Sequence, residues 1–397
     1  MGVLGNTLKA LGCFDVFALS TLALVGAMSL SASARAEAAP TEGGYGTVLV
    51  ATENSSEKAK KAADFVGNGE GDQEEINAAI KALPEPGGTV LLAEGTYDIR
   101  KVEGTLGGVT IDRSNVVLAG QGAATKLSQA PEQEINVIRI IGPGVGHITI
   151  RDLWVDANRD ENPKGGGAPN ISHDRFEYCG IKAYCVKPGE SPGAPNHDIT
   201  IRNTRVFDAR ALGIMLEGPN MKVLNNVLGN ANSDAVEILT GPGEIRGNYA
   251  TITGRTHVAI GTDRADSIIM SDNIVHVKEG GDLDIAFRSW AGSKRHVIAN
   301  NVVTVDAGGA CKRAIDVRGT ETVVQCNNFH TANPEAPLLL AITAGNAVVT
   351  GNVFENVVIE VDDNTEDLKP ILIGHNILQN SVVQHKQGDL RLLPTPE

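Results

Sequence analysis

The segment Val297-Ile298-Ala299-Asn300-Asn301-Val302, a short apolar run that ends at an asparagine, returns in varied form along the second half of the chain. Related segments are Val223-Leu224-Asn225-Asn226-Val227, Glu244-Ile245-Arg246-Gly247-Asn248, Val348-Val349-Thr350-Gly351-Asn352-Val353 and Leu372-Ile373-Gly374-His375-Asn376-Ile377. One register of asparagines recurs every 22 to 28 residues, at Asn203, Asn226, Asn248, Asn273, Asn301, Asn328, Asn352 and Asn376. This regular return indicates a protein built from repeated structural units.

Each repeat contains short stretches of alternating apolar and polar residues broken by glycine and asparagine, which is typical of β-strands rather than helices. One unit cannot bury its apolar face alone, whereas stacked coils pair their strands in parallel and share a continuous core. The recurring asparagine would lie at a turn, where its amide bonds to the equivalent residues above and below. The sequence therefore predicts an all-β fold, a single-stranded right-handed parallel β-helix.

The ends of such a solenoid must be covered. We expect an N-terminal capping α-helix over residues 72–83, with Asp72 as its N-cap and one apolar face formed by Ile76, Ala79, Ile80 and Leu83. The solenoid domain would cover residues 61–385, after an extension over 37–60. A polar tail over 386–397 would lie across the other end.

The composition excludes several classes of protein. The 397 residues carry 34 Lys and Arg against 48 Asp and Glu, a net charge of −14, and 42% of them are apolar. A chain this rich in apolar residues is not disordered, and the absence of a basic stripe argues against a nucleic-acid partner.

The N-terminus has the features of a secretory signal. An uncharged run from Val16 to Leu30 precedes Ser33-Ala34-Arg35-Ala36, which predicts cleavage after Ala36 and a secreted or periplasmic protein. The alternative is a membrane anchor, but the run is shorter than the roughly 20 residues that span a bilayer. We therefore expect residues 1–36 to be a signal peptide, with no stable membrane insertion.

Four cysteines would remain in the exported chain. Their short separations favour disulfides between Cys179 and Cys185 and between Cys311 and Cys326. A zinc site is disfavoured because no C-x-x-C pair or neighbouring histidine pair accompanies them.

The segment Ala62-Ala63-Asp64-Phe65-Val66-Gly67-Asn68-Gly69, followed by the expected helix and by Gly87-Gly88-Thr89-Val90-Leu91-Leu92, resembles the N-terminal cap of the pectate-lyase-like β-helix superfamily. A second set, Leu153 to Arg159, Tyr178 to Ile181 and His197 to Asn203, resembles mannuronan epimerases. The resemblance implies an exported protein that acts on polysaccharide or oligosaccharide. The chain departs from the epimerases near Ala211 to Glu217, where it lacks their tyrosine and Asp-Pro-His motif, and only Asp234 matches the acid of their next coil.

Aligning the strand that opens each coil predicts which residues share a face. The inward column would be Ile138, Ile181, Ile214, Val236, Val258, Ile285 and Ile315. The neighbouring outward column would be Arg139, Lys182, Met215, Glu237, Ala259, Ala286 and Asp316. A second outward column would be Ile141, Tyr184, Glu217, Leu239, Gly261, Arg288 and Arg318. The small residues Ala259, Gly261 and Ala286 would form the floor of a groove, flanked by Asp234, His257 and Asp284.

This face carries side chains suited to β-elimination of a uronate, which needs a neutralised carboxylate, a base for the C5 proton and an acid for the leaving oxygen. Candidates for base and clamp are Lys182, Tyr184, His257, Arg288 and Arg318. Carboxylates that could hold Ca²⁺ are Glu217, Asp234, Glu237 and Asp316. Candidates for substrate binding are Arg139, Trp290, Arg264, and His173 and Arg175 in the long segment 156–175.

We favour a polysaccharide lyase on these grounds. Glycoside hydrolysis is the catalytic alternative, because Glu217 and Glu237 on adjacent coils could flank a glycosidic bond. A C5-epimerase and a non-catalytic glycan-binding surface protein are further alternatives. The sequence predicts no particular sugar, linkage or oligomeric state.

Overall fold

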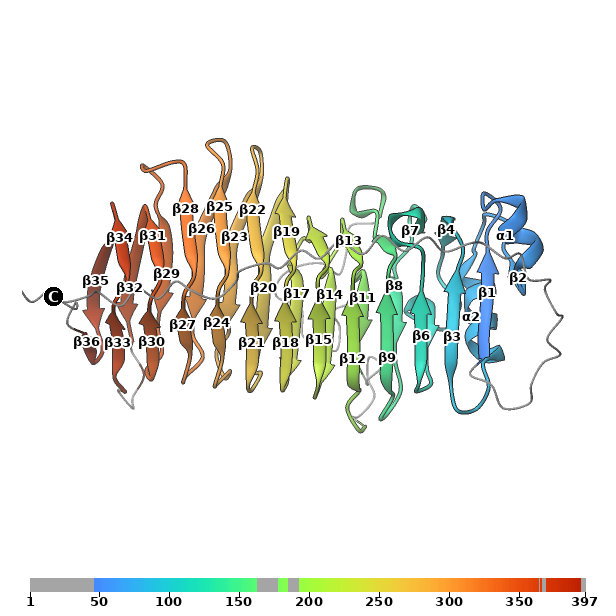
Figure 1. Ribbon diagram of the computed structural model, residues 1–397, viewed down its shortest axis with the longest axis horizontal. Coiled ribbons are helices and arrows are strands. Elements are labelled where there is room, and N and C mark those ends of the chain that lie inside the picture. Colours follow the sequence, from blue (N-terminus) through green and yellow to red (C-terminus); the bar gives the residue numbers. More distant parts are fainter. Residues whose placement is uncertain (1–45, 163–177, 185–192, 364, 366–368, 394–397) are drawn as a thin grey trace, which may run out of the picture. The chain divides into compact units, whose positions relative to one another are not determined.

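The computed structural model describes residues 46–162, 178–184, 193–363, 365 and 369–393. Within these residues the chain forms three parallel β-sheets, which we call sheets A, B and C, and the coils follow one another from β1 to β36 (Figure 1). From β3 onward each coil contributes one strand to each sheet. The predicted all-β parallel solenoid is confirmed. The predicted signal peptide lies outside the described residues.

Sheet A has 14 strands among the described residues, in the order β2 (Phe65–Val66), β1 (Gly46–Ala51), β3 (Gly88–Leu92), β6 (Val116–Ala119), β9 (Gly146–Arg151), β12 (His197–Arg202), β15 (Met221–Leu224), β18 (Gly243–Arg246), β21 (Ile268–Ser271), β24 (Val297–Ala299), β27 (Val323–Gln325), β30 (Ala347–Thr350), β33 (Ile371–Gly374) and β36 (Leu390–Leu392).

Sheets B and C have 11 strands each in the same part of the chain. Sheet B consists of β4 (Gly95–Ile99), β7 (Thr125–Gln129), β10 (Trp154–Asp156), β13 (Arg205–Phe207), β16 (Val227–Gly229), β19 (Tyr249–Ile252), β22 (Ile274–Val277), β25 (Val302–Val305), β28 (Asn328–Thr331), β31 (Val353–Glu355) and β34 (Ile377–Gln379). Sheet C consists of β5 (Gly107–Ile111), β8 (Asn136–Ile140), β11 (Ile181–Ala183), β14 (Ile214–Gly218), β17 (Asp234–Thr240), β20 (Arg255–Asp263), β23 (Asp282–Ser289), β26 (Ala310–Val317), β29 (Leu338–Ile342), β32 (Val357–Asp362) and β35 (Val382–Gln387).

A ladder of buried asparagines joins the coils at one corner. In its middle, Asn273 Oδ1 accepts hydrogen bonds from the backbone N and Nδ2 of Asn248, at 3.0 and 2.9 Å. Its own Nδ2 donates to Ile245 O and to Asn301 Oδ1. The same pattern links Asn226, Asn248, Asn273, Asn301, Asn327, Asn352 and Asn376. Each amide therefore ties its own coil to both neighbours.

At two places the ladder residue is not the predicted asparagine but the residue next to it in the sequence. Thr204, not Asn203, begins the ladder, because its backbone N and hydroxyl both donate to Asn226 Oδ1. Asn327 occupies the place predicted for Asn328, which begins β28 and is exposed. Where two candidate residues are adjacent, the repeat length alone does not decide which one points inward.

The helices lie near the N-terminal coil. They are α1 (Glu57–Ala62) and α2 (Gln73–Ala82), with short 3₁₀ turns η1 (Gly122–Ala124) and η2 (Arg159–Glu161). The Asp72 side chain does not cap α2. It accepts instead from Gly69 N, Asp98 N and the Thr52 hydroxyl. A helix thus lies within the predicted range 72–83, while its role as the cap of the solenoid stays a prediction.

The domain bounds predicted from the sequence are too narrow. β1 lies in the range predicted as an extension, and it pairs with β3 over residues 46–50. At the other end β36 pairs with β33, so residues 390–392 belong to sheet A rather than to a polar tail. Among the described residues, no helix has the length and apolar character needed to cross a bilayer.

Replacing a ladder residue should destabilise the protein far more than replacing its exposed neighbour. Asn273→Ala removes the acceptor of two hydrogen bonds and the donor of two others in a buried site, which should lower the free energy of unfolding by about 3 kcal/mol. Asn328→Ala, at the exposed position beside the ladder, should change it by less than about 0.5 kcal/mol. Urea unfolding measures both, and equal effects would contradict the ladder's role.

Candidate functional site

Sheet C carries a row of charged side chains on its outer side. Paired strands place Arg139, Lys182, Met215, Glu237, Gly261, Arg288 and Asp316 in one register. The row differs from the predicted one at two places, because Gly261 and Arg288 stand where Ala259 and Ala286 were expected. Arg288 therefore lies between the coils of Glu237 and Asp316.

The difference arises because side-chain alternation is interrupted in four neighbouring strands. In each, two consecutive residues pack into the interior: Ala235 and Val236, Ala259 and Ile260, Ala286 and Phe287, and Ala314 and Ile315. The same irregularity appears as a shift in the pairing of β26 with β29 between Arg313 and Ile315. Such a bulge moves the preceding residues to the other face. The predicted outward positions of Ala259 and Ala286 are therefore wrong, and Val258 and Ile285 lie outside the interior cluster.

The bulge also brings two carboxylates to one guanidinium group. Arg288 Nη2 donates to Asp234 Oδ2 at 2.6 Å and to Glu237 Oε1 at 2.7 Å, and all three side chains are buried. Burial alone would lower the pKa of Arg288, but the carboxylates of Asp234 and Glu237 outweigh it and raise that pKa. A Cβ atom at Gly261 would lie 2.8 Å from Asp234 Oδ2, so glycine leaves room for this network.

A second ion-pair group lies one coil further along. Arg318 Nη2 donates to Asp316 Oδ2 at 2.8 Å, and Arg313 Nη1 donates to the same oxygen at 3.2 Å. The Trp290 ring contacts both neighbouring arginines, with the guanidinium carbons of Arg318 and Arg288 at 4.1 and 4.9 Å from its centroid. Because Arg318 and Trp290 are only half-buried, they offer a cationic and aromatic surface to a ligand.

His257 is held by a carboxylate at the start of the same strands. Its Nδ1 lies 2.8 Å from Asp284 Oδ2, and this carboxylate also binds Lys312 Nζ at 2.5 Å and Arg255 Nη2. Partial burial would raise the pKa of Asp284, but hydrogen bonds from Arg255, Lys312 and His257 outweigh burial and lower it. The ionised Asp284 orients the imidazole so that Nε2 points away from it, which is the arrangement of an oriented general base.

An open groove of about 820 Å³ borders the group formed by His257, Asp284 and Arg255. Its lining residues are Glu132, Arg159, Asp160, Glu161, Asn162, Arg210, Asn232 and Arg255. Arg255 connects the groove to Asp284, and Arg159 Nη1 donates to Arg255 O at 3.0 Å. The sequence analysis missed Arg159, Arg210 and Arg255. The last two could have been found from the repeat, because Arg210, Asn232 and Arg255 follow one another at intervals of about one coil.

Lys182, Tyr184 and Arg139 lie further toward the N-terminal coils. Lys182 is fully buried, and its Nζ lies 5.4 Å from the ring centroid of Tyr184. β11 and β23 are separated by β14, β17 and β20, so a spacing of about 4.8 Å per strand puts Lys182 roughly 19 Å from Arg288. These groups can act on one ligand only if it extends across several coils.

Two further predicted residues, Glu217 and Arg264, are among those that the structure describes. Glu217 pairs with Leu239, two positions beyond the pairing of Met215 with Glu237. Arg264 is exposed, with its Nη2 3.7 Å from Asp263 Oδ2. Outside the described residues lie His173, Arg175 and Cys185.

The predicted disulfide between Cys311 and Cys326 is wrong, since both are free thiols. Cys311 is buried in β26 of sheet C, where its thiol donates to Arg313 O and burial raises its pKa to about 12. Cys326 is exposed after β27 of sheet A. A separation of 15 residues covers more than half a coil, so it places the two cysteines on different sheets. The pairing of Cys179 with Cys185 stays a prediction.

Comparison with known proteins supports the fold. No family model matches the chain. Alginate lyase 7 of Azotobacter vinelandii is 27% identical over 205 residues, 46% of this chain and 24% of that protein. The match therefore spans about a quarter of the relative's length.

Two solved structures illustrate the structural likeness. The A-module of mannuronan C-5 epimerase AlgE6 from Azotobacter vinelandii has a TM-score of 0.53 and 18% identity, covering 83% of this chain and 96% of that one. DFA-IIIase from Arthrobacter chlorophenolicus A6, solved in complex with GF2, has a TM-score of 0.55 and 15% identity, covering 87% and 93%. The sequence's resemblance to carbohydrate-active β-helix proteins is confirmed at the level of the fold.

Removing the buried guanidinium group of Arg288 should destabilise the folded protein. Arg288→Met removes the guanidinium group that binds the buried carboxylates of Asp234 and Glu237, which should lower the free energy of unfolding by about 3 to 5 kcal/mol. Arg295→Met, which breaks an ion pair with Asp266 at a half-exposed side chain, should cost less than about 1 kcal/mol.

The same urea unfolding experiment should include the triple variant Arg288→Met, Asp234→Asn, Glu237→Gln. Because it removes the uncompensated charges as well, it should recover part of the lost stability. A triple variant less stable than Arg288→Met would contradict this electrostatic explanation.

Proposed function

We propose that this chain is an exported carbohydrate-active protein that cleaves a uronate-containing polysaccharide by β-elimination. The observation that carries the proposal is the contact of His257 Nδ1 with Asp284 at 2.8 Å, beside Arg255, Lys312 and a groove whose lining contains three arginines and three acidic residues. This cluster combines an oriented base with cations for a substrate carboxylate. The net charge of −14 would otherwise repel an anionic chain, so local cations are needed at the site.

The chemistry assigns distinct tasks to these groups. Arg255 and Lys312, which bind Asp284, share their positive charge between that carboxylate and the uronate carboxylate, which acidifies the proton at C5. His257 Nε2 removes that proton, the electron pair forms the C4–C5 double bond, and the C4–O bond breaks as the leaving oxygen takes up a proton from water. Asp284 holds the imidazole through Nδ1 and stabilises the imidazolium that forms.

The rest of the outer row supports binding of a long substrate. From β11 to β26 the row crosses five strand spacings, or roughly 24 Å. The half-buried Tyr184 lies at one end of it, and the half-buried Arg318 and Trp290 lie at the other. A polysaccharide laid across the strands could contact both ends.

Lyase activity is favoured over hydrolysis because Glu237, one of the two carboxylates proposed for hydrolysis, binds the Arg288 guanidinium together with Asp234 in a buried network. Calcium held by Asp234, Glu237 and Asp316 would have to displace guanidinium groups that bind these carboxylates. For this reason a calcium requirement is a separate part of the proposal. Export, which rests on the N-terminal sequence alone, is another.

The test is an assay of the purified chain with a panel of polyuronates, followed through the ultraviolet absorbance of the unsaturated product. We expect activity that falls at least about 100-fold in His257→Ala, because the base is lost. The matched control is His276→Ala, which removes a half-buried histidine bonded to Asp306 on sheet B and should retain activity. Addition of a chelator separates a calcium-dependent enzyme from an independent one.

Other outcomes would reject the proposal. Release of reducing ends without any rise in absorbance would indicate a hydrolase. Absence of both signals with every polyuronate would favour a glycan-binding protein without catalysis. Full activity of His257→Ala would remove His257 as the base.

A further inference from the structure

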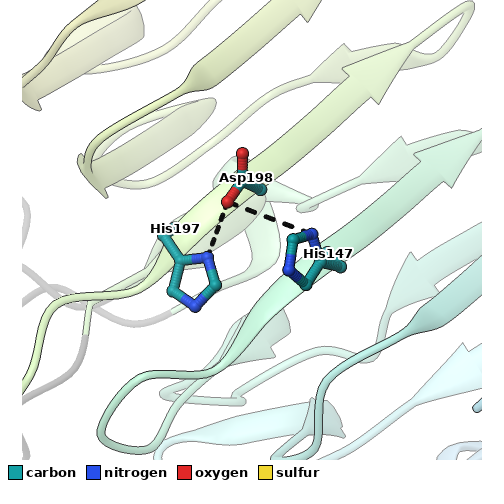
Figure 2. Close-up of side chains that lie close together, drawn as sticks. All are labelled: His147, His197 and Asp198. Carbon is teal, nitrogen blue, oxygen red and sulfur yellow. Dashed lines mark hydrogen bonds and ion pairs between the residues drawn. The ribbon is translucent and has the colours of Figure 1, made fainter. Parts of the chain in front are cut away.

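A cluster of two histidines and one aspartate lies on sheet A, apart from the sheet C site. His147 comes from β9, and His197 and Asp198 come from β12 in the next coil (Figure 2). His197 Nδ1 lies 2.7 Å from Asp198 Oδ2, and His147 Nδ1 lies 3.9 Å from the same oxygen. The two imidazole rings are 5.1 Å apart in an edge-to-face arrangement. Both rings therefore face one carboxylate oxygen.

The backbone explains why these side chains converge. Gly146 pairs with His197, so His147 lies opposite Asp198 on the neighbouring strand. His147 and Asp198 have left-handed φ values of 56° and 51°, which histidine and aspartate tolerate better than most residues. A Cβ atom at Gly146 would lie 2.4 Å from His197 Nδ1, so only glycine leaves room for the His197 ring.

The carboxylate is positioned to act as a ligand. Asn220 Nδ2 donates to Asp198 Oδ1 at 3.2 Å, which leaves Oδ2 directed at the two histidines. The hydrogen bond from His197 is the main reason that the pKa of Asp198 is lowered, so this carboxylate is ionised at neutral pH. The His147 side chain is 61% exposed and can rotate toward a bound ion without disturbing the core.

We propose that His147 Nδ1, His197 Nδ1 and Asp198 Oδ2 bind a divalent transition-metal ion such as Zn²⁺. One ligand atom from each of these residues lies within 4.8 Å of the others. Bond lengths of about 2.0 to 2.1 Å put two ligand atoms of a tetrahedral zinc site roughly 3.3 Å apart, a value between the two distances to Asp198 Oδ2. Two imidazole nitrogens with one carboxylate suit zinc or copper, whereas Ca²⁺ prefers an all-oxygen shell.

Binding requires one change of protonation. The proton between His197 Nδ1 and Asp198 would leave, with neutral His197 then carrying its remaining proton on Nε2, and the metal would take its place. Affinity should therefore fall below about pH 6, where protons compete for both imidazoles.

The metal would connect two adjacent coils of sheet A. It would stabilise the folded chain in proportion to its occupancy, because the ligands are about 50 residues apart in the sequence and separate on unfolding. The site lies on a different sheet from His257, so its loss should leave polyuronate cleavage unchanged. The two proposals can therefore fail independently.

The test uses the untagged full chain, freed of metal with a chelator and titrated with ZnCl₂ by calorimetry. We expect one ion per chain, and a Kd raised at least about ten-fold in His147→Gln and in Asp198→Asn. His330→Gln, which alters a half-buried histidine paired with Glu355 on sheet B, is the matched control and should bind as the wild type does. Circular dichroism confirms that each variant is folded.

A second readout locates the ion. Zinc should raise the Tm of the wild type and of His330→Gln but not of His147→Gln, and Co²⁺ should give visible absorption bands typical of nitrogen ligation only where the site is intact. Absence of binding at about 1 mM Zn²⁺ would overturn the proposal. Unchanged affinity in a variant with both His147→Gln and His197→Gln would also overturn it.

Discussion

The stacking of the coils depends on the buried asparagine ladder, because each amide bonds to the coil before it and to the coil after it. Asn273, for example, donates to Ile245 O and Asn301 Oδ1 while it accepts from Asn248. A buried amide satisfied in this way tolerates no shift of one coil against the next, since a shift would leave several polar groups unpaired. From Thr204 to Asn376 this constraint helps to fix the register of the coils, and with it the rows of side chains on their outer faces.

The chemical character of sheet C comes from an interruption of that regularity. In four neighbouring strands two successive residues turn inward, such as Ala259 with Ile260 and Ala286 with Phe287. Residues on either side of each bulge then share the outer face, which lets Asp234 and Glu237 reach one nitrogen of Arg288. A buried group of this kind contributes little net stability compared with an apolar one, but it holds its members in one geometry. The half-exposed Trp290 packs against Arg288 of this group and against Arg318, so the group helps to hold both side chains in place.

The molecule separates two kinds of site by face. Sheet C and its border combine His257, Asp284 and cationic side chains around a groove, which suits an extended anionic ligand. Sheet A instead brings His147 and His197 together beside Asp198, the arrangement proposed to bind a metal ion. A solenoid can carry both because each outer face is built from a different strand of every coil, so residues on one face vary without disturbing the other.

The sequence by itself determined the parallel solenoid, the repeat length and most of the buried columns, because apolar alternation and a recurring asparagine depend only on local order along the chain. It also placed Arg288, Glu237 and His257 on one face of the solenoid. Only the tertiary structure decided their partners, since an inference from strict alternation reverses the face wherever a bulge inserts one residue, as at Ala259 and Ala286. The tertiary structure also brings His147 next to His197 and puts Cys311 and Cys326 on different sheets. Which corner of a coil a residue occupies depends on the three-dimensional path of the whole turn, and sequence separation does not encode that path.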